Sequence, residues 1–483
     1  MGFVFYDTET TGTDTAFDQI LQFAAIHTDD ELNELERFNI RCRLLPHIVP
    51  APGAMRVTGV RADQLFLPSL PSHYEMMRVI RGKLLEWSPS LFVGYNSLEF
   101  DEHLLRQSFY MTLHPPYLTN THGNGRSDVL RMVQAASLFA PNALALPMTD
   151  DGGTIFKLDR VAPANGFDHR HAHDALADVE ATIFLCRRLK ERAPKIWSSF
   201  MEFSNKASVS EYLASEPTFC FSEFYFAKPY SWIVIYIGSN PEVTTEHLVF
   251  DLSNDPAEFA ALSDDELAER LQKSPKPVRR IKGNASPIIM PTADAPSICA
   301  ALQLGADELA RRAELLQADE ALCARLIRAL LSIREKPEES AHVEKQLYSG
   351  FFSDADSARL NLFHRLPWEE RPAIVAQFED RRLRLIGRRL LYVERPELLS
   401  VSERVEFSHA IAKRLAGDSG DEPWLTLPKA IAALDELLAS TDGTEQKLLQ
   451  EHRAHLIDRQ SCAAERNVDE NALHRVDHAV EAG

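Results

Sequence analysis

The first 195 residues alternate between strand-like and helix-like patterns, and this alternation restricts the fold more than any other feature. Apolar or alternating runs of strand length occupy residues 3–6, 20–27, 36–43 and 91–95. Apolar residues at helical spacing occupy residues 74–87, 101–110, 129–139 and 174–189. Strands mixed with helices in this order predict an α/β layer architecture.

The pattern changes twice beyond residue 195. Residues 218–237 are rich in aromatic and β-branched residues, and residues 247–252 and 277–282 resemble further strands, which predicts a β-rich barrel or sandwich. A helix is expected within it over residues 257–272. From about residue 306 the pattern is helical, and from about residue 459 it lacks a sustained apolar face. The domains expected from these changes are residues 1–196, 197–350 and 351–460, followed by a loose tail at 461–483.

The first predicted strand ends in two carboxylates, in the string Phe3-Val4-Phe5-Tyr6-Asp7-Thr8-Glu9-Thr10-Thr11-Gly12. Strand side chains alternate between faces, so Asp7 and Glu9 point the same way and Thr8 points to the other face. Two carboxylates crowded on one face repel each other, and a hard divalent cation relieves that repulsion. A solvated strand end remains the alternative interpretation of this string alone.

Two later segments add acidic residues and a histidine. Asp101 follows the short strand in Gly94-Tyr95-Asn96-Ser97-Leu98-Glu99-Phe100-Asp101, at the start of a predicted helix. His173 and Asp178 lie in His173-Asp174-Ala175-Leu176-Ala177-Asp178, where five residues correspond to about 140° around a helix, so His173 must reach the site from the preceding loop. The alternative is that Asp101 and Asp174 only cap their helices.

The order Asp-x-Glu, Asp, His…Asp resembles the DEDDh family of 3′→5′ exonucleases. The resemblance implies a ribonuclease H-like exonuclease domain, with a mixed sheet and helices, and two Mg²⁺ ions for which Mn²⁺ can substitute. It implies that Asp7, Glu9 and Asp178 hold one ion and that Asp7 and Asp101 hold the second. It also implies that His173 is the general base, a role suited to an imidazole with a pKa near 6.5.

A distal string narrows the resemblance to the exonuclease I family of bacterial single-strand DNA exonucleases. That string is Gln346-Leu347-Tyr348-Ser349-Gly350-Phe351-Phe352-Ser353-Asp354-Ala355-Asp356. Shorter likenesses lie in Gln22-Phe23-Ala24-Ala25-Ile26, Pro52-Gly53-Ala54, Ala164-Asn165-Gly166 and residues 378–389. The family has an exonuclease domain, an SH3-like β-rich domain and an all-α C-terminal domain around a channel for one strand.

This second resemblance implies the release of 5′-mononucleotides from single-stranded DNA, in DNA repair and recombination. It also implies a partner, the acidic tail of single-stranded DNA-binding protein. One departure is Thr8, because exonuclease I proteins commonly carry an aromatic residue between the two acids, whereas Asp-Thr-Glu-Thr-Thr-Gly is commoner in polymerase proofreaders. A DEDDh exoribonuclease, a proofreading exonuclease and a catalytically idle nucleic-acid scaffold remain alternatives, and the five intact residue types argue against the scaffold.

Substrate contacts are expected from basic and aromatic residues, because a single-strand channel needs cations for the phosphates and rings for the bases. Glu9 and Lys157 match substrate-contacting positions of the family. Arg106 and Tyr117 follow Asp101 at suitable spacing, and Arg126 lies in a predicted Gly-rich turn, Gly123-Asn124-Gly125-Arg126. For each of them, a surface charge or a core aromatic would look the same. Two basic runs outside the first domain, near residues 273–282 and 381–389, are further candidates for phosphate contacts. The alternative for the second run is that it pairs with the acids near it, which are Glu369, Glu370, Glu379 and Asp380.

The net charge of −19 argues against a nonspecific nucleic-acid coat protein. Residues 1–195 hold 19 Lys and Arg against 24 Asp and Glu, so the acidity is concentrated outside the part with the candidate site. No apolar run approaches the roughly 18 residues of a membrane helix, no secretory signal begins the chain, and the six cysteines form no CxxC motif. We therefore expect a cytoplasmic monomer that acts without a membrane.

Overall fold

The computed structural model describes residues 2–168, 174–335, 338–417 and 420–480, with side chains described as far as residue 465. Its first domain contains a five-stranded mixed sheet in the order β3-β2-β1-β4-β5. β2 is antiparallel to β1 and β3, whereas β1, β4 and β5 run parallel. The strands are β1 (Gly2–Thr10), β2 (Ile20–Thr28), β3 (Glu34–Arg41), β4 (Ser90–Gly94) and β5 (Gly125–Asp128). This arrangement confirms the predicted α/β exonuclease-type sheet.

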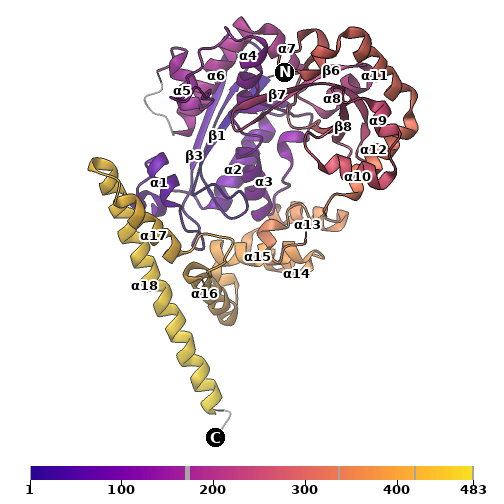
Figure 1. Ribbon diagram of the computed structural model, residues 1–483. Coiled ribbons are helices and arrows are strands. Elements are labelled where there is room, and N and C mark those ends of the chain that lie inside the picture. The colour runs from indigo at the N-terminus through magenta and orange to yellow at the C-terminus, as the bar shows by residue number, and fades with distance from the viewer. Residues whose placement is uncertain (1, 169–173, 336–337, 418–419, 481–483) are drawn as a thin grey trace.

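Helices cover both faces of this sheet (Figure 1). Phe3 and Phe5 of β1 pack against a core supplied by α4 (Val129–Phe139), α6 (Ala175–Arg192) and α7 (Pro194–Glu202). Val4 and Tyr6 face the opposite way, into a core shared with α2 (His73–Glu86) and α3 (Asp101–Met111). The alternation along β1 therefore directs odd-numbered side chains towards α6 and even-numbered side chains towards α3. The shorter helices are α1 (Pro52–Thr58) and α5 (Leu158–Ala164).

The second domain is an antiparallel sheet in the order β10-β6-β7-β8-β9, which confirms the predicted β-rich domain. Its strands are β6 (Phe219–Tyr225), β7 (Lys228–Ser239), β8 (Glu246–Asp251), β9 (Val278–Lys282) and β10 (Ile288–Pro291). Its helices are α8 (Lys206–Ser215), α9 (Pro256–Ala260), α10 (Asp264–Gln272), α11 (Ala306–Ala318) and α12 (Glu320–Ser332). A capping box between Ser263 and Glu266 starts α10, so the helix expected over residues 257–272 is two helices.

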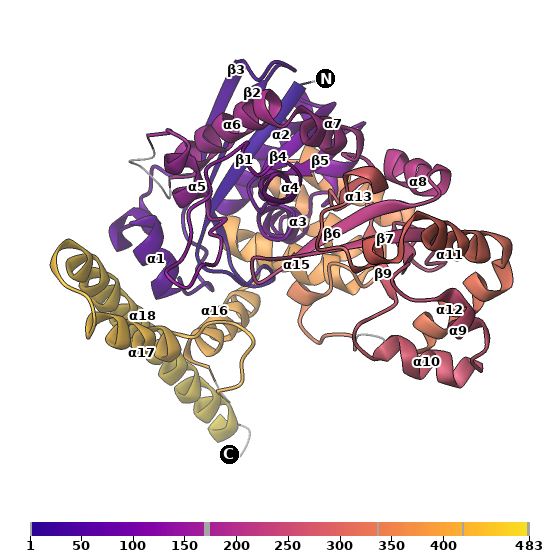
Figure 2. The ribbon, with the colours of Figure 1, turned by 45° about the horizontal axis from the view of Figure 1, so that its top comes forward.

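The third domain is helical and lies against the α2 and α3 side of the first domain (Figures 1 and 2). Its helices are α13 (Asp354–Arg365), α14 (Arg371–Gln377), α15 (Arg381–Glu394), α16 (Val401–Ala416), α17 (Leu427–Leu438) and α18 (Gly443–Val480). Tyr74, Tyr110 and Leu113 of the first domain share one buried core with Phe363 and Ile386 of the third. The two domains therefore pack together through a common apolar core.

Helix α18 projects from the third domain and ends at Val480 (Figure 1). Leu449 and Leu456 bury its first half against α16 and α17. Residues 461–480 continue the helix, which differs from the predicted loose tail. Extending an existing helix needs no new nucleation, so a segment without an apolar face can remain helical. In the described part of the chain, no helix is long and apolar enough to cross a membrane.

Candidate active site

Three carboxylates meet where the end of β1 faces α6. Carboxylate oxygens of Asp7, Glu9 and Asp178 all lie within 4.8 Å of one another. Asp7 and Glu9 share a face of β1 because they are two residues apart, and Asp178 lies in the first turn of the helix that covers that face. The structure thus brings together three of the predicted metal ligands. Oxygen ligands in such a group suit Mg²⁺ or Mn²⁺.

The electrostatics of the three carboxylates favour a bound cation. Burial raises the pKa of Asp7 well above its usual value, and the charges of Asp101 and Asp178 raise it further. Burial, followed by the charges of Asp178 and Asp101, raises the pKa of Glu9 to about 8. The raised pKa values show that these crowded carboxylates lack compensating positive charge. A bound divalent cation would supply it.

Asp101 reaches this region from the first turn of α3. Its carboxylate lies outside the 4.8 Å group, but its charge is the largest influence on the pKa of Asp7 after burial. The hydroxyl and the backbone N–H of Thr8 both donate to Oδ1 of Asp101, at 2.5 and 3.1 Å. Burial raises the pKa of Asp101 to about 7, and these hydrogen bonds act in the opposite direction. The sequence predicted that Thr8 points to the opposite face of β1 from Asp7 and Glu9. It did not predict the contact between Thr8 and Asp101.

The predicted general base, His173, lies outside the described residues. Its neighbour Asp174 caps α6 by accepting a hydrogen bond from the Leu176 N–H at 3.2 Å, as the alternative interpretation of that segment expected. Asp174 also pairs with Arg41 of β3 at 3.1 Å. Its charge contributes to the raised pKa values of Asp7 and Glu9, so Asp174 is a neighbour of the site. From the sequence, Asp174 was expected only to cap a helix.

Arg106 and Arg126 are buried against Glu102. Their guanidinium groups lie 2.7 and 3.0 Å from Glu102 Oε1, which also accepts from the Thr119 hydroxyl. Burial raises the pKa of Glu102, but the two arginines outweigh it and hold that pKa below its usual value. Arg126 lies in β5 and not in the predicted Gly-rich turn at residues 123–126, because the turn is limited to residues 122–123. The structure therefore gives both arginines a structural ion pair, and a contact with substrate remains a prediction.

Tyr117 and Lys157 are more accessible. The Arg106 guanidinium lies 5.4 Å from the centre of the half-buried Tyr117 ring. The centre of the Phe351 ring, in the third domain, lies 6.2 Å from the centre of the Tyr117 ring. Lys157 is exposed and immediately precedes α5. Both remain predicted substrate contacts, with side chains that solvent and ligands can reach.

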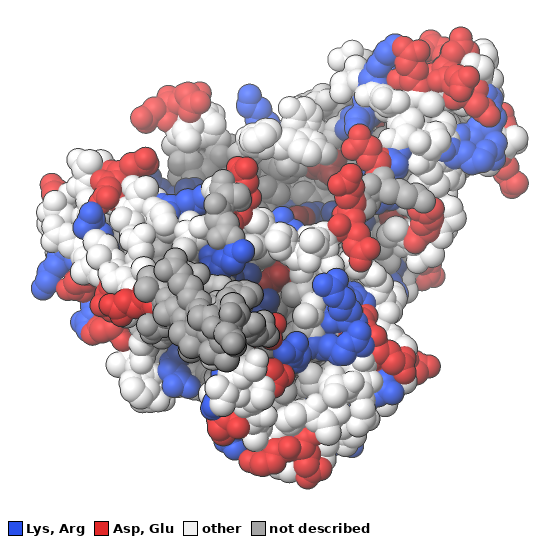
Figure 3. Space-filling model, turned by 90° about the horizontal axis from the view of Figure 1, so that it is seen from below, with Lys and Arg blue, Asp and Glu red and all other residues white. Residues whose placement is uncertain are grey.

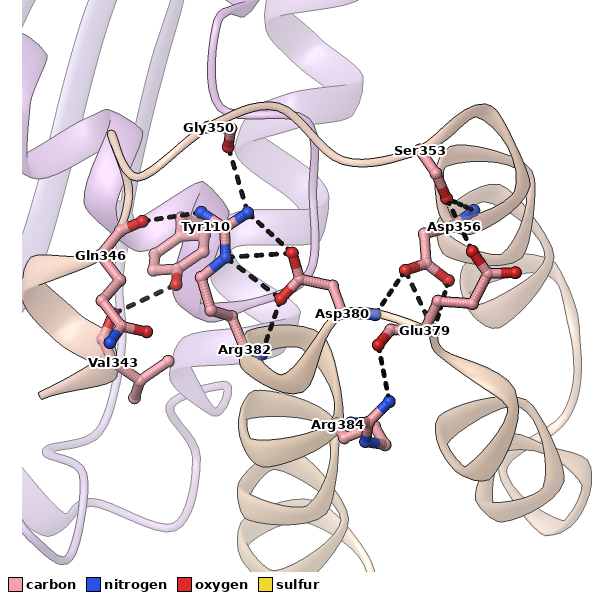
Figure 4. Close-up of polar contacts among 10 residues, drawn as sticks. All are labelled: Tyr110, Val343, Gln346, Gly350, Ser353, Asp356, Glu379, Asp380, Arg382 and Arg384. Carbon is pink, nitrogen blue, oxygen red and sulfur yellow. Dashed lines mark hydrogen bonds and ion pairs between the residues drawn. The ribbon is translucent and has the colours of Figure 1, made fainter. Parts of the chain in front are cut away.

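The distal string at residues 346–356 forms an anchored loop that leads into α13 (Figure 4). Arg382 of α15 donates to the carbonyls of Gln346 and Gly350, at 2.8 and 3.1 Å, and its guanidinium lies 4.7 Å from the Phe352 ring. Asp356 accepts from the N–H groups of residues 379 and 380. These contacts hold the loop while leaving Phe351 90% exposed.

A groove of about 820 Å³ lies between the first domain and the β-rich domain. Asn96 and Glu99, from the loop that precedes Asp101, line one end. The β6–β7 hairpin and β9 line the other side, with exposed cations at Lys276, Arg280 and Lys282. Phe226, at the tip of the hairpin, is fully exposed within this groove. The groove thus joins basic and aromatic side chains to the loop that leads into Asp101.

Most of the second basic run has structural partners instead. Arg382 pairs with Asp380 at 2.7 Å and Arg389 with Glu344 at 2.9 Å, while Arg388 lies 3.4 Å from Glu403. Acids therefore pair with these three arginines, but only Asp380 is among the acids that the sequence suggested as partners of this run.

Three family models match consecutive parts of the chain. Residues 4–185 match the Exonuclease model, residues 204–331 the Exonuclease I SH3-like domain, and residues 341–459 the Exonuclease I C-terminal domain. These matches follow the order of the three observed domains.

Curated relatives that align over most of the chain agree with these matches. The exodeoxyribonuclease I of Haemophilus influenzae is 30% identical over 413 residues, covering 79% of this chain and 84% of the relative. That of Escherichia coli is 28% identical over 397 residues, covering 79% and 83%.

Solved structures show the same architecture. Exonuclease I from Methylocaldum szegediense is similar with a TM-score of 0.82 and 26% identity, covering 95% of this chain and 99% of that structure. E. coli exonuclease I in complex with a dA16 oligonucleotide gives a TM-score of 0.81 at 25% identity, with the same coverage. The matched domains, their order and the relative that is 30% identical over 79% of the chain together show that this chain belongs to the exodeoxyribonuclease I family.

Proposed function

We propose that the protein is a 3′→5′ exonuclease that degrades single-stranded DNA to 5′-mononucleotides and serves DNA repair and recombination. The observation that carries the proposal is the group formed by Asp7, Glu9 and Asp178, within 4.8 Å of one another and beside Asp101. Family membership supplies the substrate class, since E. coli exonuclease I has been solved with a bound dA16 oligonucleotide.

The carboxylates would hold two Mg²⁺ ions, with Mn²⁺ as a substitute. Asp7, Glu9 and Asp178 supply the oxygen ligands for one ion, and Asp7 with Asp101 supplies those for the second. When bound, such a pair of cations activates the attacking water and stabilises the leaving 3′ oxygen. Glu9 is 9% exposed, so little bulk water competes with a cation for its carboxylate.

His173 is proposed as the general base that takes the proton of the attacking water. Its place in the chain, five residues before Asp178, lets the segment preceding α6 bring an imidazole to the carboxylates. Asp174 caps that helix and pairs with Arg41 of β3 at 3.1 Å.

The strand would follow the groove between the first two domains. Lys276, Arg280 and Lys282 can contact phosphates there, and the exposed Phe226 can stack on a base. Phe351 does not line this groove, but it is exposed on the third domain beside Tyr117 and can stack on a further base. Lys157 and Tyr117, with Glu9, are the proposed contacts nearest the reacting end. We further propose a monomer of 54.4 kDa, with the acidic tail of single-stranded DNA-binding protein as a partner.

The activity can be tested with Asp178→Asn against a matched control on the same helix, Glu180→Gln. Glu180 pairs with Arg37 at 3.1 Å on the surface, so its replacement should leave activity within about twofold. Removing the Asp178 charge should lower the rate about 1,000-fold, because a lost metal ligand removes several kcal/mol of transition-state stabilisation. End-labelled single-stranded DNA, duplex DNA and single-stranded RNA are the substrates.

Three results would overturn parts of this proposal. Full activity of Asp178→Asn would exclude the metal assignment. Faster degradation of RNA than of DNA would favour an exoribonuclease. A wild-type protein that binds single strands in Mg²⁺ without shortening them would favour the non-enzymatic scaffold.

A further inference from the structure

We propose that Thr8 is a positioning residue whose hydroxyl fixes the Asp101 carboxylate and thereby sets the affinity of the site for divalent cations. The inference rests on the proposed function, in which Asp101 is the ligand supplied by α3. Its basis is the pair of hydrogen bonds, from the Thr8 hydroxyl at 2.5 Å and the Thr8 N–H at 3.1 Å, to one oxygen of Asp101.

The sheet explains why the backbone of Thr8 is free to make this contact. β1 pairs with β4 only as far as Phe5 and Val93, and β4 ends at Gly94. Beyond that point β1 continues to Thr10 with β2 on one edge only. The carboxylate of Asp101 takes the place that a neighbouring strand would occupy beside Thr8, so that a buried N–H is not left without an acceptor.

The hydroxyl adds what the N–H alone cannot. A carboxylate held by one hydrogen bond can still rotate about that bond, whereas two donors from different directions fix its orientation. Both donors meet Oδ1, which leaves Oδ2 outside this pair of hydrogen bonds and available as an oxygen ligand. Thr8 and Asp101 are 6% and 4% exposed, so little water competes with the contact.

The same face of β1 makes a second, separate contact with α3. The hydroxyl of Tyr6, two residues before Thr8, donates to Glu102 Oε2 at 3.1 Å. Glu102 belongs to the buried ion pairs with Arg106 and Arg126 and not to the cation-binding carboxylates. Thr8 is therefore the residue through which β1, already the source of Asp7 and Glu9, also orients the acid contributed by α3.

The test compares Thr8→Val, which keeps the shape and the backbone N–H but removes the hydroxyl, with Thr8→Ser, which keeps the donor. Mn²⁺ binding to the DNA-free protein is measured by titration calorimetry, and kcat and KM are measured on single-stranded DNA. Loss of a residue that orients a metal ligand typically weakens metal affinity 10- to 100-fold. We expect Thr8→Val to weaken Mn²⁺ binding about 10-fold and to lower kcat with little change in KM, whereas Thr8→Ser stays within about threefold of wild type.

Thr28→Val is the matched control for removing a buried threonine hydroxyl from this sheet. Thr28 is fully buried in β2, and its hydroxyl donates to the carbonyl of Asp29, away from the carboxylates. This variant should bind Mn²⁺ as the wild type does. Thermal melting of each variant shows whether it folds. If Thr8→Val does not fold, Thr8→Cys, whose thiol is a weaker donor, takes its place in the comparison with Thr8→Ser.

A double-mutant cycle separates this proposal from the proposed function. If Thr8 acts through Asp101, then Thr8→Val should change Mn²⁺ binding less than twofold in an Asp101→Asn background. Unchanged Mn²⁺ affinity in folded Thr8→Val, or equal losses in Thr8→Val and Thr8→Ser, would overturn the role of the hydroxyl. Wild-type Mn²⁺ binding by Asp7→Asn would instead overturn the metal site itself.

Discussion

At the scale of single residues, the raised pKa of Glu9 makes the stability of the metal-free protein depend on pH. Glu9 titrates near 8 when folded and near 4.5 when unfolded, so between these values the folded state keeps a proton that the unfolded chain has lost. Its contribution to stability is complete below pH 4.5 and is lost as the pH rises through 8. In EDTA, melting of the wild type should therefore fall from pH 6 to pH 8.5 by about 3 °C more than melting of Glu9→Gln.

Added Mn²⁺ should reverse this trend, because a cation competes with the proton for the carboxylate. It should raise the melting temperature of the wild type more at pH 8.5 than at pH 6, as measured by thermal-shift fluorescence. Glu180→Gln, on the surface of α6, should behave as the wild type in both series. Identical pH slopes for wild type and Glu9→Gln would show that Glu9 does not titrate in this window.

At the scale of secondary-structure elements, the loop at residues 346–353 has some side chains that are exposed for binding and other contacts that hold the loop in place. Phe351 is 90% exposed and Tyr348 59%, while Arg382 anchors the loop from α15. Stacking of one base on an aromatic ring contributes about 1–3 kcal/mol. Phe351→Ala should weaken binding of a single-stranded oligonucleotide about 10-fold, by fluorescence anisotropy in EDTA, without lowering the melting temperature. Leu35→Ala, at a position of β3 that is 60% exposed, should change neither quantity.

The elements also show what the sequence could predict. Long periodic elements such as α4 and α6 were predicted because their apolar residues recur at helical spacing. Strand alternation placed Asp7 and Glu9 together correctly. β5 was not predicted, since its four residues are all buried and show no alternation. Glu102 and Arg106 have the i,i+4 spacing of a helical ion pair, but Arg126 joins them from β5, and only the sheet order reveals that contact.

At the scale of the whole molecule, a chain of net charge −19 must bind a polyanion through local groups of cations. On the described part of the face seen from below, Lys and Arg lie in small groups among Asp and Glu (Figure 3). The second basic run is largely paired within the protein, at Arg382, Arg388 and Arg389. The exposed cations of the groove beside β9 are therefore the better candidates for phosphate contacts.

Replacing Arg280 and Lys282 together with Gln should reduce the salt dependence of single-strand binding. Both side chains are exposed in the groove. Each phosphate contact to a single strand contributes about 0.7 to the slope of log affinity against log salt, so the double variant should lose about 1.4 from that slope and bind roughly 10-fold more weakly at 0.1 M salt. Lys273→Gln is the control, because Lys273 pairs with Glu269 at 2.6 Å outside the groove. An unchanged slope in the double variant would place the strand elsewhere on the molecule.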